Sequence, residues 1–391
     1  MEREKAAILT WCNNNGPTNY GQILQCYAMQ KNLERWGFDS FVVQYRRKDY
    51  RDIFKHNFSN KTALGRRLNS YFEQKYNIKV IEKEKTKRVE LFWDFIRRYI
   101  RLTAPCYTKE AVEYETKDCK LLVCGSDQIW NPLWVNEVLL LGFGNDKQRR
   151  VSYAPSGIFY EDEKSVISYK NMAPYIEKLD VVTVREQCGA DILSKYVNKE
   201  IKVMPDPTIL LSAADWDGAA VERMIEEDYI FCYVMGSMRP YQMVFRELMK
   251  RYGVKKIVYI PSNLVADGKF LWLEQFAEAG PAEFISLIKY AKAVCTDSFH
   301  GTVMSVLYGK PFYNVGRKQP GSEKYGGAER IENLLVELEI KTRTVRNVKA
   351  VRYMEDISYE SVNKRLNKIR LETDNFWKNK LTDVNLQKGI I

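Results

Sequence analysis

Short blocks of apolar residues alternate with amphipathic stretches along most of the chain. The first block, Ala6 to Trp11, predicts a buried strand, and after a polar loop a helical pattern runs from Gln22 to Arg35. Gly37 ends that helix, and a second strand is expected at Phe41–Val43. A strand, a loop, a helix and a strand in this order form a βαβ unit, which crosses over right-handed and builds a parallel sheet. The pattern therefore predicts an α/β fold.

The same alternation continues in two blocks, which the polar, alanine-rich stretch 212–228 separates. In the first block we expect strands at Lys120–Cys124, Arg150–Ala154, Asp180–Val184 and Ile201–Met204 and helices at Glu161–Leu179 and Glu186–Tyr196. In the second block we expect strands at Tyr229–Met235, Lys256–Ile260, Ala293–Thr296 and Pro311–Val315, and helices at Tyr241–Tyr252, Pro281–Tyr290, Gly301–Tyr308 and Tyr359–Leu381.

The length of 391 residues is typical of two domains. We expect an N-terminal α/β domain over residues 1–211 with a basic helical insertion at 46–103, a C-terminal α/β domain over 212–358, and a C-terminal helix and tail over 359–391. Hydrophobic residues make up 45% of the chain and charged residues 28%, which excludes a disordered or fibrous protein.

The sequence also predicts a cytoplasmic location. The longest apolar run, Val138 to Phe143, is much shorter than the roughly 18 residues of a membrane-spanning helix. The N-terminus passes directly into the first predicted strand and shows no signal-peptide pattern. We therefore expect neither a membrane span nor secretion.

Cysteine and histidine contents limit metal chemistry. The eight cysteines are scattered without the two-residue spacing of zinc or redox motifs, so reduced and mostly buried thiols are expected. The chain has two histidines, His56 and His300, which excludes a zinc site made of several imidazoles. We expect no cofactor and no metal site, while a metal held by carboxylates is left open.

Positive charge is concentrated in one segment. The net charge of the chain is +11, and residues 46–102, with 17 Lys/Arg and 7 Asp/Glu, account for +10 of it. The end of this segment places Phe92, Trp93 and Ile96 at helical spacing among basic residues, which predicts an amphipathic helix. Such a helix either packs its aromatic stripe on its own domain or docks on an anionic membrane surface or a lipid-linked substrate. Because acidic residues interleave with the basic ones, we expect no nucleic-acid partner.

The strongest chemical signal lies after the predicted strand 293–296, where Asp297, Ser298 and His300 precede a helix. Ligands of parallel sheets bind at the carboxyl ends of the strands, and free N–H groups at a helix N-terminus favour anions such as phosphate. His300 is therefore a candidate contact to such an anion. Alternatively, it caps its own helix or satisfies a buried carbonyl.

Two other strands end in candidate site residues. Arg185 follows the strand 180–184, where it can either clamp a carboxylate or phosphate or form a salt bridge with Glu186 or a loop carboxylate. Ser126 and Asp127 follow Gly125, where they can cap a turn or bind a sugar hydroxyl.

Two glycine-containing loops add polar groups. In the first, Asn19 and neighbouring asparagines offer amides suited to carbohydrate hydroxyls, without a dinucleotide or Walker fingerprint. The second carries Arg317, Lys318, Lys324 and Arg330 among glycines. It is either a solvated surface loop or a lid that closes on an anion or an acceptor.

Six motifs resemble the polysaccharide pyruvyl transferase family in chain order: Asn19–Gln25, Gly125–Pro132, Ser152–Gly157, Val184–Glu186, Asp206–Thr208 and Thr296–Thr302. The resemblance implies two Rossmann-like domains that face each other across a cleft, similar to the B-type glycosyltransferases. It implies transfer of a pyruvyl group from phosphoenolpyruvate to sugar hydroxyls of a cell-surface polysaccharide or its lipid-linked precursor, forming a pyruvate ketal. The enzyme is then expected in the cytoplasm, in peripheral contact with the inner face of the membrane.

The resemblance places the acceptor on the first domain and the donor on the second. Arg185 and His300 match the positions expected to hold or protonate phosphoenolpyruvate. Ser298, Gly301, Thr302 and Arg330 are the candidate donor-binding residues. Asn19, Tyr20, Ser126 and Asp127 are the candidates for binding the glycan or lipid-linked oligosaccharide acceptor, and Asp127, Asp206 and Asp297 are candidates for the base that deprotonates it.

The chain departs from the family at one position. Better-studied members of the family that this chain resembles carry an Arg-Leu-His triplet where this chain has Ser298, Phe299 and His300. Ser298 with backbone N–H groups, or one of Arg317, Lys318 and Arg330, can bind the anion instead; otherwise the donor or the reaction differs. The alternative function is a nucleotide-sugar-dependent glycosyltransferase of the same architecture, with Glu283 or Glu323 as the ribose-binding acid.

Overall fold

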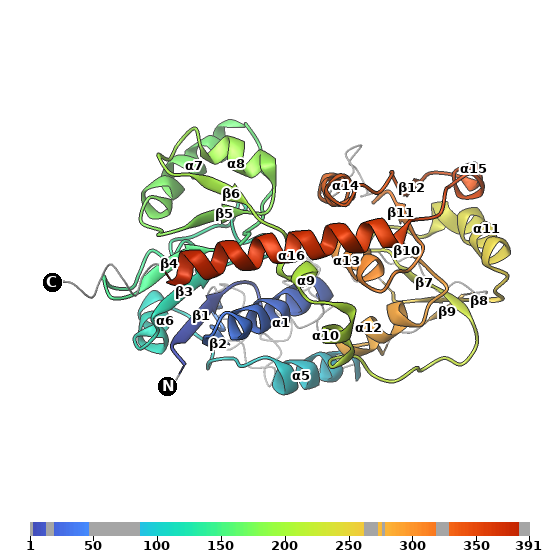
Figure 1. Ribbon diagram of the computed structural model, residues 1–391, viewed down its shortest axis with the longest axis horizontal. Helices are drawn as coiled ribbons and strands as arrows, with labels where there is room; N and C mark the ends of the chain where they lie inside the picture. The colour runs from blue at the N-terminus through green and yellow to red at the C-terminus, as the bar shows by residue number, and fades with distance from the viewer. Residues whose placement is uncertain are drawn as a thin grey trace, which may run out of the picture.

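Parallel β-sheets organise both halves of the chain (Figure 1). The computed structural model describes residues 3–12, 19–46, 87–261, 273–275, 278–317 and 328–382. In the first half, β1 (Lys5–Leu9), β2 (Asp39–Val42), β3 (Leu121–Cys124) and β4 (Arg149–Ser152) pair in parallel in the order β2-β1-β3-β4. β5 (Val182–Val184) and β6 (Ile201–Val203) pair with each other, and a parallel bridge between Val151 and Val181 connects them to β4.

The second half forms a six-stranded parallel sheet in the order β12-β11-β10-β7-β8-β9. Its strands are β7 (Tyr229–Tyr233), β8 (Lys256–Tyr259), β9 (Glu274–Gln275), β10 (Ala293–Thr296), β11 (Phe312–Val315) and β12 (Thr344–Val345). All strands except the two-residue β9 and β12 lie within two residues of their predicted bounds. The prediction of an α/β protein with two Rossmann-like sheets is confirmed.

Helices cover both sheets. The predicted ones are α1 (Tyr20–Arg35), α5 (Lys87–Tyr99), α7 (Glu163–Ile176), α8 (Gln187–Leu193), α11 (Gln242–Tyr252), α12 (Pro281–Lys289), α13 (Phe299–Leu307) and α16 (Tyr359–Thr382). In the described ranges, five further helices lie where none was predicted: α6 (Lys109–Thr116), α9 (Pro207–Leu210), α10 (Ala213–Asp217), α14 (Ala328–Glu337) and α15 (Val348–Arg352), besides the 3₁₀ turn Arg239–Tyr241. Four of these five are short, and α14 was missed because a glycine-rich segment precedes it.

Helix α16 (Tyr359–Thr382) joins the two halves and runs across the middle of the molecule in Figure 1. At its start, the Tyr359 hydroxyl donates a hydrogen bond to the carbonyl of Lys310 in the second half. Near its end, the Trp377 ring stacks on Trp36 of α1 with a centroid distance of 5.8 Å. A single helix therefore fixes the first domain against the second.

A second contact between the halves is aromatic. Tyr20, the first residue of α1, is fully buried and stacks on Phe284 of α12 with a centroid distance of 4.5 Å. Its ring also contacts Phe92 of α5 at 4.8 Å and Tyr233 of β7 at 5.3 Å. The Tyr20 hydroxyl donates a 2.5 Å hydrogen bond to the carbonyl of Ala279. The start of α1 is thus anchored in the second domain.

The predicted basic helix is observed as α5 (Lys87–Tyr99), whereas residues 47–86 of the same segment lie outside the described residues. Phe92 and Ile96 are buried, and Arg97 on the opposite side is exposed. The aromatic stripe is therefore used for packing, and it reaches α12 of the second domain as well as its own domain. None of the helices in the described ranges combines the length and the apolar character that a membrane crossing needs.

We expect Trp377→Ala to destabilise the protein strongly, because the side chain is 1% exposed and packs on Trp36 and Tyr153 across the chain. Truncation of a buried tryptophan removes about 3–5 kcal/mol of unfolding free energy. Leu371→Ala on the same helix, at a side chain that is 62% exposed, is the control and should lose less than about 0.5 kcal/mol. Urea unfolding measures both, and equal losses would show that α16 does not join the halves through Trp377.

Candidate active site at the junction of the two domains

A buried carboxylate lies where the two halves meet. Asp206, in the loop before α9, is 1% exposed, and its Oδ2 atom faces three side chains. It lies 2.5 Å from Arg185 Nη1, 3.4 Å from Ser126 Oγ and 3.5 Å from His300 Nε2. Arg185 follows β5, Ser126 follows β3 and His300 lies in the first turn of α13. The structure therefore brings three predicted site residues from both domains to one carboxylate.

The second oxygen of Asp206 holds the start of helix α9. Oδ1 accepts hydrogen bonds from the Thr208 backbone N–H at 3.0 Å and from the Thr208 hydroxyl at 2.6 Å. Pro207 occupies the first helical position, where a missing N–H has no consequence. Burial alone raises the pKa of Asp206, but the nearby His300 and Arg185 hold it well below its usual range. Asp206 is therefore ionised and fixed on both sides.

Arg185 has two carboxylate partners and one uncommitted nitrogen. Besides its bond to Asp206, its Nε donates to Glu186 Oε1 at 3.1 Å, and that oxygen also accepts from Ser156 Oγ at 2.5 Å. Burial lowers the pKa of Arg185, but the charges of Glu186 and Asp206 outweigh it and the pKa is raised. Among the described residues, no hydrogen-bond acceptor meets Arg185 Nη2. The salt bridge that we considered as an alternative exists, and it leaves the buried Nη2 group without an acceptor.

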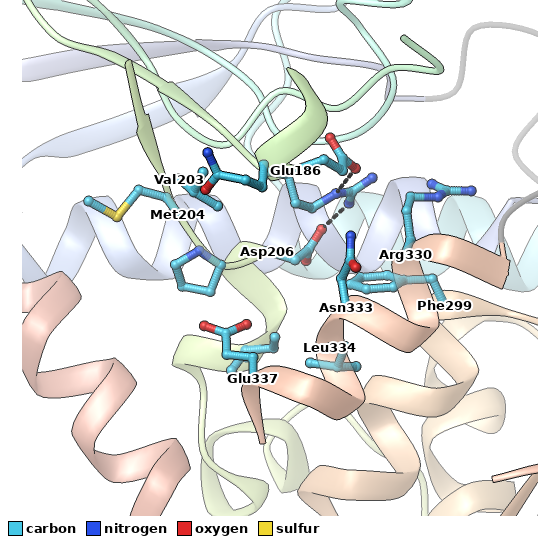
Figure 2. Close-up of a pocket in the computed structure, with 13 residues that line it drawn as sticks. Glu186, Val203, Met204, Asp206, Phe299, Arg330, Asn333, Leu334 and Glu337 are labelled. Atoms are coloured by element: carbon cyan, nitrogen blue, oxygen red, sulfur yellow. Dashed lines mark hydrogen bonds and ion pairs between the residues drawn. The ribbon is translucent and has the colours of Figure 1, made fainter. Parts of the chain in front are cut away.

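A cavity of about 200 Å³ opens beside this network. Figure 2 shows Glu186 and Asp206 with their dashed bonds on one side and Phe299, Arg330, Asn333 and Glu337 on the other. The Arg185 guanidinium lies over the Phe299 ring, with its Cζ atom 5.0 Å from the ring centroid. Residues from both domains thus line the cavity, as a cleft between them requires.

Arg330 was predicted in a loop, but it lies in the first turn of α14 and lines the cavity. Burial and the charge of Arg185 lower the pKa of Arg330 to about 10. When the Gln128 amide is oriented with its oxygen toward Arg330, that oxygen accepts hydrogen bonds of 2.9 and 3.0 Å from the two Nη atoms. The contact joins the first domain to the second.

His300 touches the first domain through a glycine. A Cβ atom on Gly21, in the first turn of α1, would lie 2.3 Å from His300 Nδ1 and 2.8 Å from Cε1. Only glycine leaves room for the imidazole there. Because Nε2 faces Asp206, contacts on two sides fix the ring.

The donor-binding candidates at the start of α13 build the helix rather than the cavity wall. Ser298 is the N-cap, and its Oγ accepts the Gly301 N–H at 3.3 Å. Gly301 and Thr302 are buried, and Thr302 Oγ1 donates to the Ser298 carbonyl at 3.0 Å while accepting from Asn314 at 2.8 Å. A serine three residues before a helical glycine was a signal for this N-cap role.

Three of the four acceptor-binding candidates have other contacts. Tyr20 is buried in the aromatic contact with α12, so it cannot reach an acceptor in this structure. Asn19 caps α1 by accepting the Gln22 N–H at 3.3 Å. Ser126 Oγ donates to the Ala154 carbonyl at 2.7 Å and faces Asp206. Of the four, Asp127 is half-buried and keeps a carboxylate near the cavity arginines.

The three candidate bases differ in their surroundings. Asp206 is committed to Arg185 and Thr208. Asp297 accepts the Met235 and Gly236 N–H groups at 2.7 and 2.8 Å and pairs with Arg317, so it is committed too. Asn333 and Glu337, which line the cavity, were not predicted as site residues because α14 itself was not predicted. No cluster of three or more His, Cys, Asp or Glu side chains in the described ranges is placed to hold a metal ion.

The sequence and the fold were compared with known proteins. The model of the polysaccharide pyruvyl transferase family matches residues 19–319. The comparison with curated proteins gives no match.

A solved UDP-N-acetylglucosamine 2-epimerase is similar to this chain with a TM-score of 0.50 and 10% identity, over 95% of both chains. The calicheamicin glycosyltransferase CalG4 gives a TM-score of 0.45 at 12% identity over 100% of both chains. The glycosyltransferase SnogD from Streptomyces nogalater gives 0.42 at 12% identity, over 98% of this chain and 99% of its own. The predicted fold of two Rossmann-like domains is confirmed by the two parallel sheets and by the similarity to the epimerase.

We expect Asp206→Asn to destabilise the protein in a pH-dependent way. The folded-state pKa of Asp206 is depressed below its ordinary value of 3.8, so its contribution is present above that pH and is lost as the pH falls below it. At pH 7 the variant should lose about 3 kcal/mol, because Arg185 loses a buried partner. The difference from the wild type should shrink below about pH 4.

Urea unfolding between pH 7 and pH 3.5 measures this difference. Asp356→Asn is the control, since that side chain is 89% exposed in its ion pair with Arg251, and its stability should match the wild type. A loss in Asp206→Asn that stays constant over the whole range would show that the carboxylate charge is not what stabilises the site.

We expect Gly21→Ala to displace the His300 imidazole, because the new methyl group would overlap the ring. The imidazole NMR signals report this directly, since the chain has only two histidines. Gly218→Ala is the matched control: its Cβ would meet nothing closer than 3.6 Å. Unchanged His300 signals in Gly21→Ala would mean that the ring is not held by this contact.

Proposed function

The chain belongs to the polysaccharide pyruvyl transferase family, and on that premise we propose that it transfers a pyruvyl group from phosphoenolpyruvate to hydroxyl groups of a polysaccharide or its lipid-linked precursor. The product is a cyclic pyruvate ketal, and no cofactor takes part. The observation that supports this proposal best is the meeting of Arg185 and His300, one from each domain, at Asp206 beside a cavity.

The donor suits a cationic site because it carries a carboxylate and a phosphate. Arg185 is buried and ionised, and its Nη2 edge has no acceptor among the described residues. A guanidinium edge binds a carboxylate or phosphate through charge-assisted hydrogen bonds. Asp206 and Glu186 keep the head group in one position, so little side-chain entropy is lost when an anion binds.

We assign the proton transfer to His300. A proton from the imidazole adds to the methylene carbon of phosphoenolpyruvate, and the positive charge develops at C2. One acceptor hydroxyl adds to C2 and gives up its proton to a base. A second hydroxyl then displaces the phosphate and closes the ketal ring, and its proton leaves with the inorganic phosphate. Asp206, which does not touch the donor in this scheme, positions the imidazole through Nε2.

We assign deprotonation of the acceptor to Asp127. Asp206 and Asp297 are engaged by cations and backbone N–H groups, whereas the Asp127 side chain is half-buried and carries no hydrogen bond from the described residues. Its charge acts on both Arg185 and Arg330, which places the carboxylate near the two cavity arginines, where it can accept a proton from an acceptor hydroxyl.

A lipid-linked acceptor and a peripheral contact with an anionic membrane remain part of this proposal. The basic character of residues 46–102 and the exposed arginines of α5, such as Arg98, support this part. Arg97 on the same helix already pairs with Asp94. The cytoplasmic location is proposed on the same basis.

His300→Ala should abolish pyruvyl transfer while the protein stays folded, because Asp206 keeps Arg185 as its partner. Release of phosphate from phosphoenolpyruvate in the presence of a glycan acceptor, with NMR detection of the ketal methyl group, measures transfer. His56→Ala, at the other histidine, is the control and should retain activity. We expect Arg185→Ala to destabilise the fold as well, because it leaves two buried carboxylates without their cation.

Thermal-shift and calorimetric titrations separate the two donor classes. Phosphoenolpyruvate should raise the melting temperature of the wild type, since a ligand that prefers the native state stabilises it. In the transfer assay, a wild-type rate for His300→Ala would show that His300 takes no part in the mechanism. A response to UDP- or GDP-sugars with none to phosphoenolpyruvate would instead favour the nucleotide-sugar-dependent glycosyltransferase.

A further inference from the structure

The charges around the cavity are unevenly compensated. Arg185 pairs with two buried carboxylates, Glu186 at 3.1 Å and Asp206 at 2.5 Å. Arg330 lines the same cavity, but its observed partner is the neutral amide of Gln128. Within the described part of the chain, no carboxylate forms an ion pair with Arg330. The carboxylates of Glu186 and Asp127 favour the charged form of Arg330 without forming an ion pair with it, so one wall of the cavity carries a guanidinium whose charge the described residues compensate only in part.

Such a charge is unfavourable in a half-buried position. Burial and the neighbouring positive charge of Arg185 both lower the pKa of Arg330, to about 10. A cation that is partly removed from water and not paired raises the free energy of the folded protein. An anion that binds between the two arginines would remove this penalty, so the cavity favours anionic ligands.

Other positive groups near the junction are already engaged. Arg317 Nε lies 3.2 Å from Asp297 Oδ2, and its Nη2 donates to the Asp297 carbonyl at 3.0 Å. It lines a separate cavity of about 90 Å³ on the other face of α14, together with Arg346. At the start of α13, the Gly301 N–H, which could otherwise contact an anion, already donates to the Ser298 hydroxyl. Arg330 is therefore the described residue best placed to add a second positive contact to the cavity.

We propose that Arg330 is the residue that makes this cavity select a dianion: the phosphate of the donor binds at Arg330, and its carboxylate binds at the Nη2 edge of Arg185. The orientation follows from the carboxylates, because Glu186 and Asp206 border the Arg185 end and repel the more highly charged phosphate group. Both Nη atoms of Arg330 donate to the Gln128 oxygen when the amide is oriented toward them, so the first domain fixes the guanidinium at the wall of the cavity. This inference rests on the proposed function for the identity of the donor.

Isothermal titration of the full chain with phosphoenolpyruvate tests the assignment. Loss of a charge-assisted contact to phosphate should weaken binding about 30-fold in Arg330→Ala. Arg330→Lys keeps the charge but not the fork, and it should lose about fivefold. Arg352→Ala is the control for removal of an exposed arginine from the same domain, because Arg352 pairs with Glu247 and lines neither cavity, and it should bind as the wild type does.

Two further measurements separate this role from a structural one. Without ligand, Gln128→Ala removes the same contact between the domains and should lower the melting temperature as much as Arg330→Ala does. A loss of phosphoenolpyruvate binding of equal size in both variants would indicate a structural arginine. Pyruvate, which lacks the phosphate, should bind the wild type and Arg330→Ala equally. A preference for phosphoenolpyruvate over pyruvate that persists in Arg330→Ala would overturn the assignment.

The outcomes for the donor and for Arg330 are distinguishable. If the wild type binds phosphoenolpyruvate and Arg330→Ala binds it equally well, the proposal for Arg330 fails and the proposed function stands. Loss of binding in Arg317→Ala in place of Arg330→Ala would transfer the phosphate contact to the other cavity. If the wild type binds only a UDP-sugar, the proposed donor fails, and the same pair of variants then decides whether its diphosphate depends on Arg330.

Discussion

The buried carboxylate of Asp206 is the contact on which the arrangement of this site depends. It lies in the chain segment between the two sheets and faces Arg185 and Ser126 of the first domain and His300 of the second. A buried carboxylate without a cation is strongly unfavourable, so the positions of these partners are linked to the stability of the fold. The same residue therefore connects the two domains electrostatically and sets the distance between the two groups that we assign to the donor.

Other contacts make this junction rigid. The aromatic stack of Tyr20 on Phe284 fixes the start of α1, and α16 ties the end of the chain back to the first domain through Trp377. Because α1 is fixed at Tyr20, the following residue, Gly21, meets the imidazole of His300 at close range. Groups held in place before substrate arrives need no reorganisation during the reaction, which is how enzymes stabilise developing charge effectively. The packing of the interface and the chemistry of the site are thus parts of one arrangement.

The sequence was informative where a residue's role follows from its place along the chain. The alternation of apolar blocks located the strands to within two residues, and the rule that ligands bind at the carboxyl ends of parallel strands pointed to Arg185 and His300. That rule places residues near a site, but it does not say which side chains face it. Ser298 caps its helix, because a backbone N–H at the helix start needs an acceptor. Tyr20 packs in the interface, because its ring is buried against Phe284. Arg330 was misplaced in a loop because the glycines before α14 hid the helical spacing of Ile331, Leu334 and Leu335.

The distribution of charge explains why two arginines in one cavity have different tasks. Arg185 is surrounded by Glu186 and Asp206, which fix its head group and hold it ionised, but which also oppose a second highly charged anion at that place. Arg330 is held by a neutral amide, so its positive potential reaches the cavity without opposition from a paired carboxylate. A site built in this way combines a precisely oriented hydrogen-bond donor with a separate centre of positive charge. A donor with a carboxylate at one end and a phosphate at the other matches both features at once, whereas a monoanion matches only one.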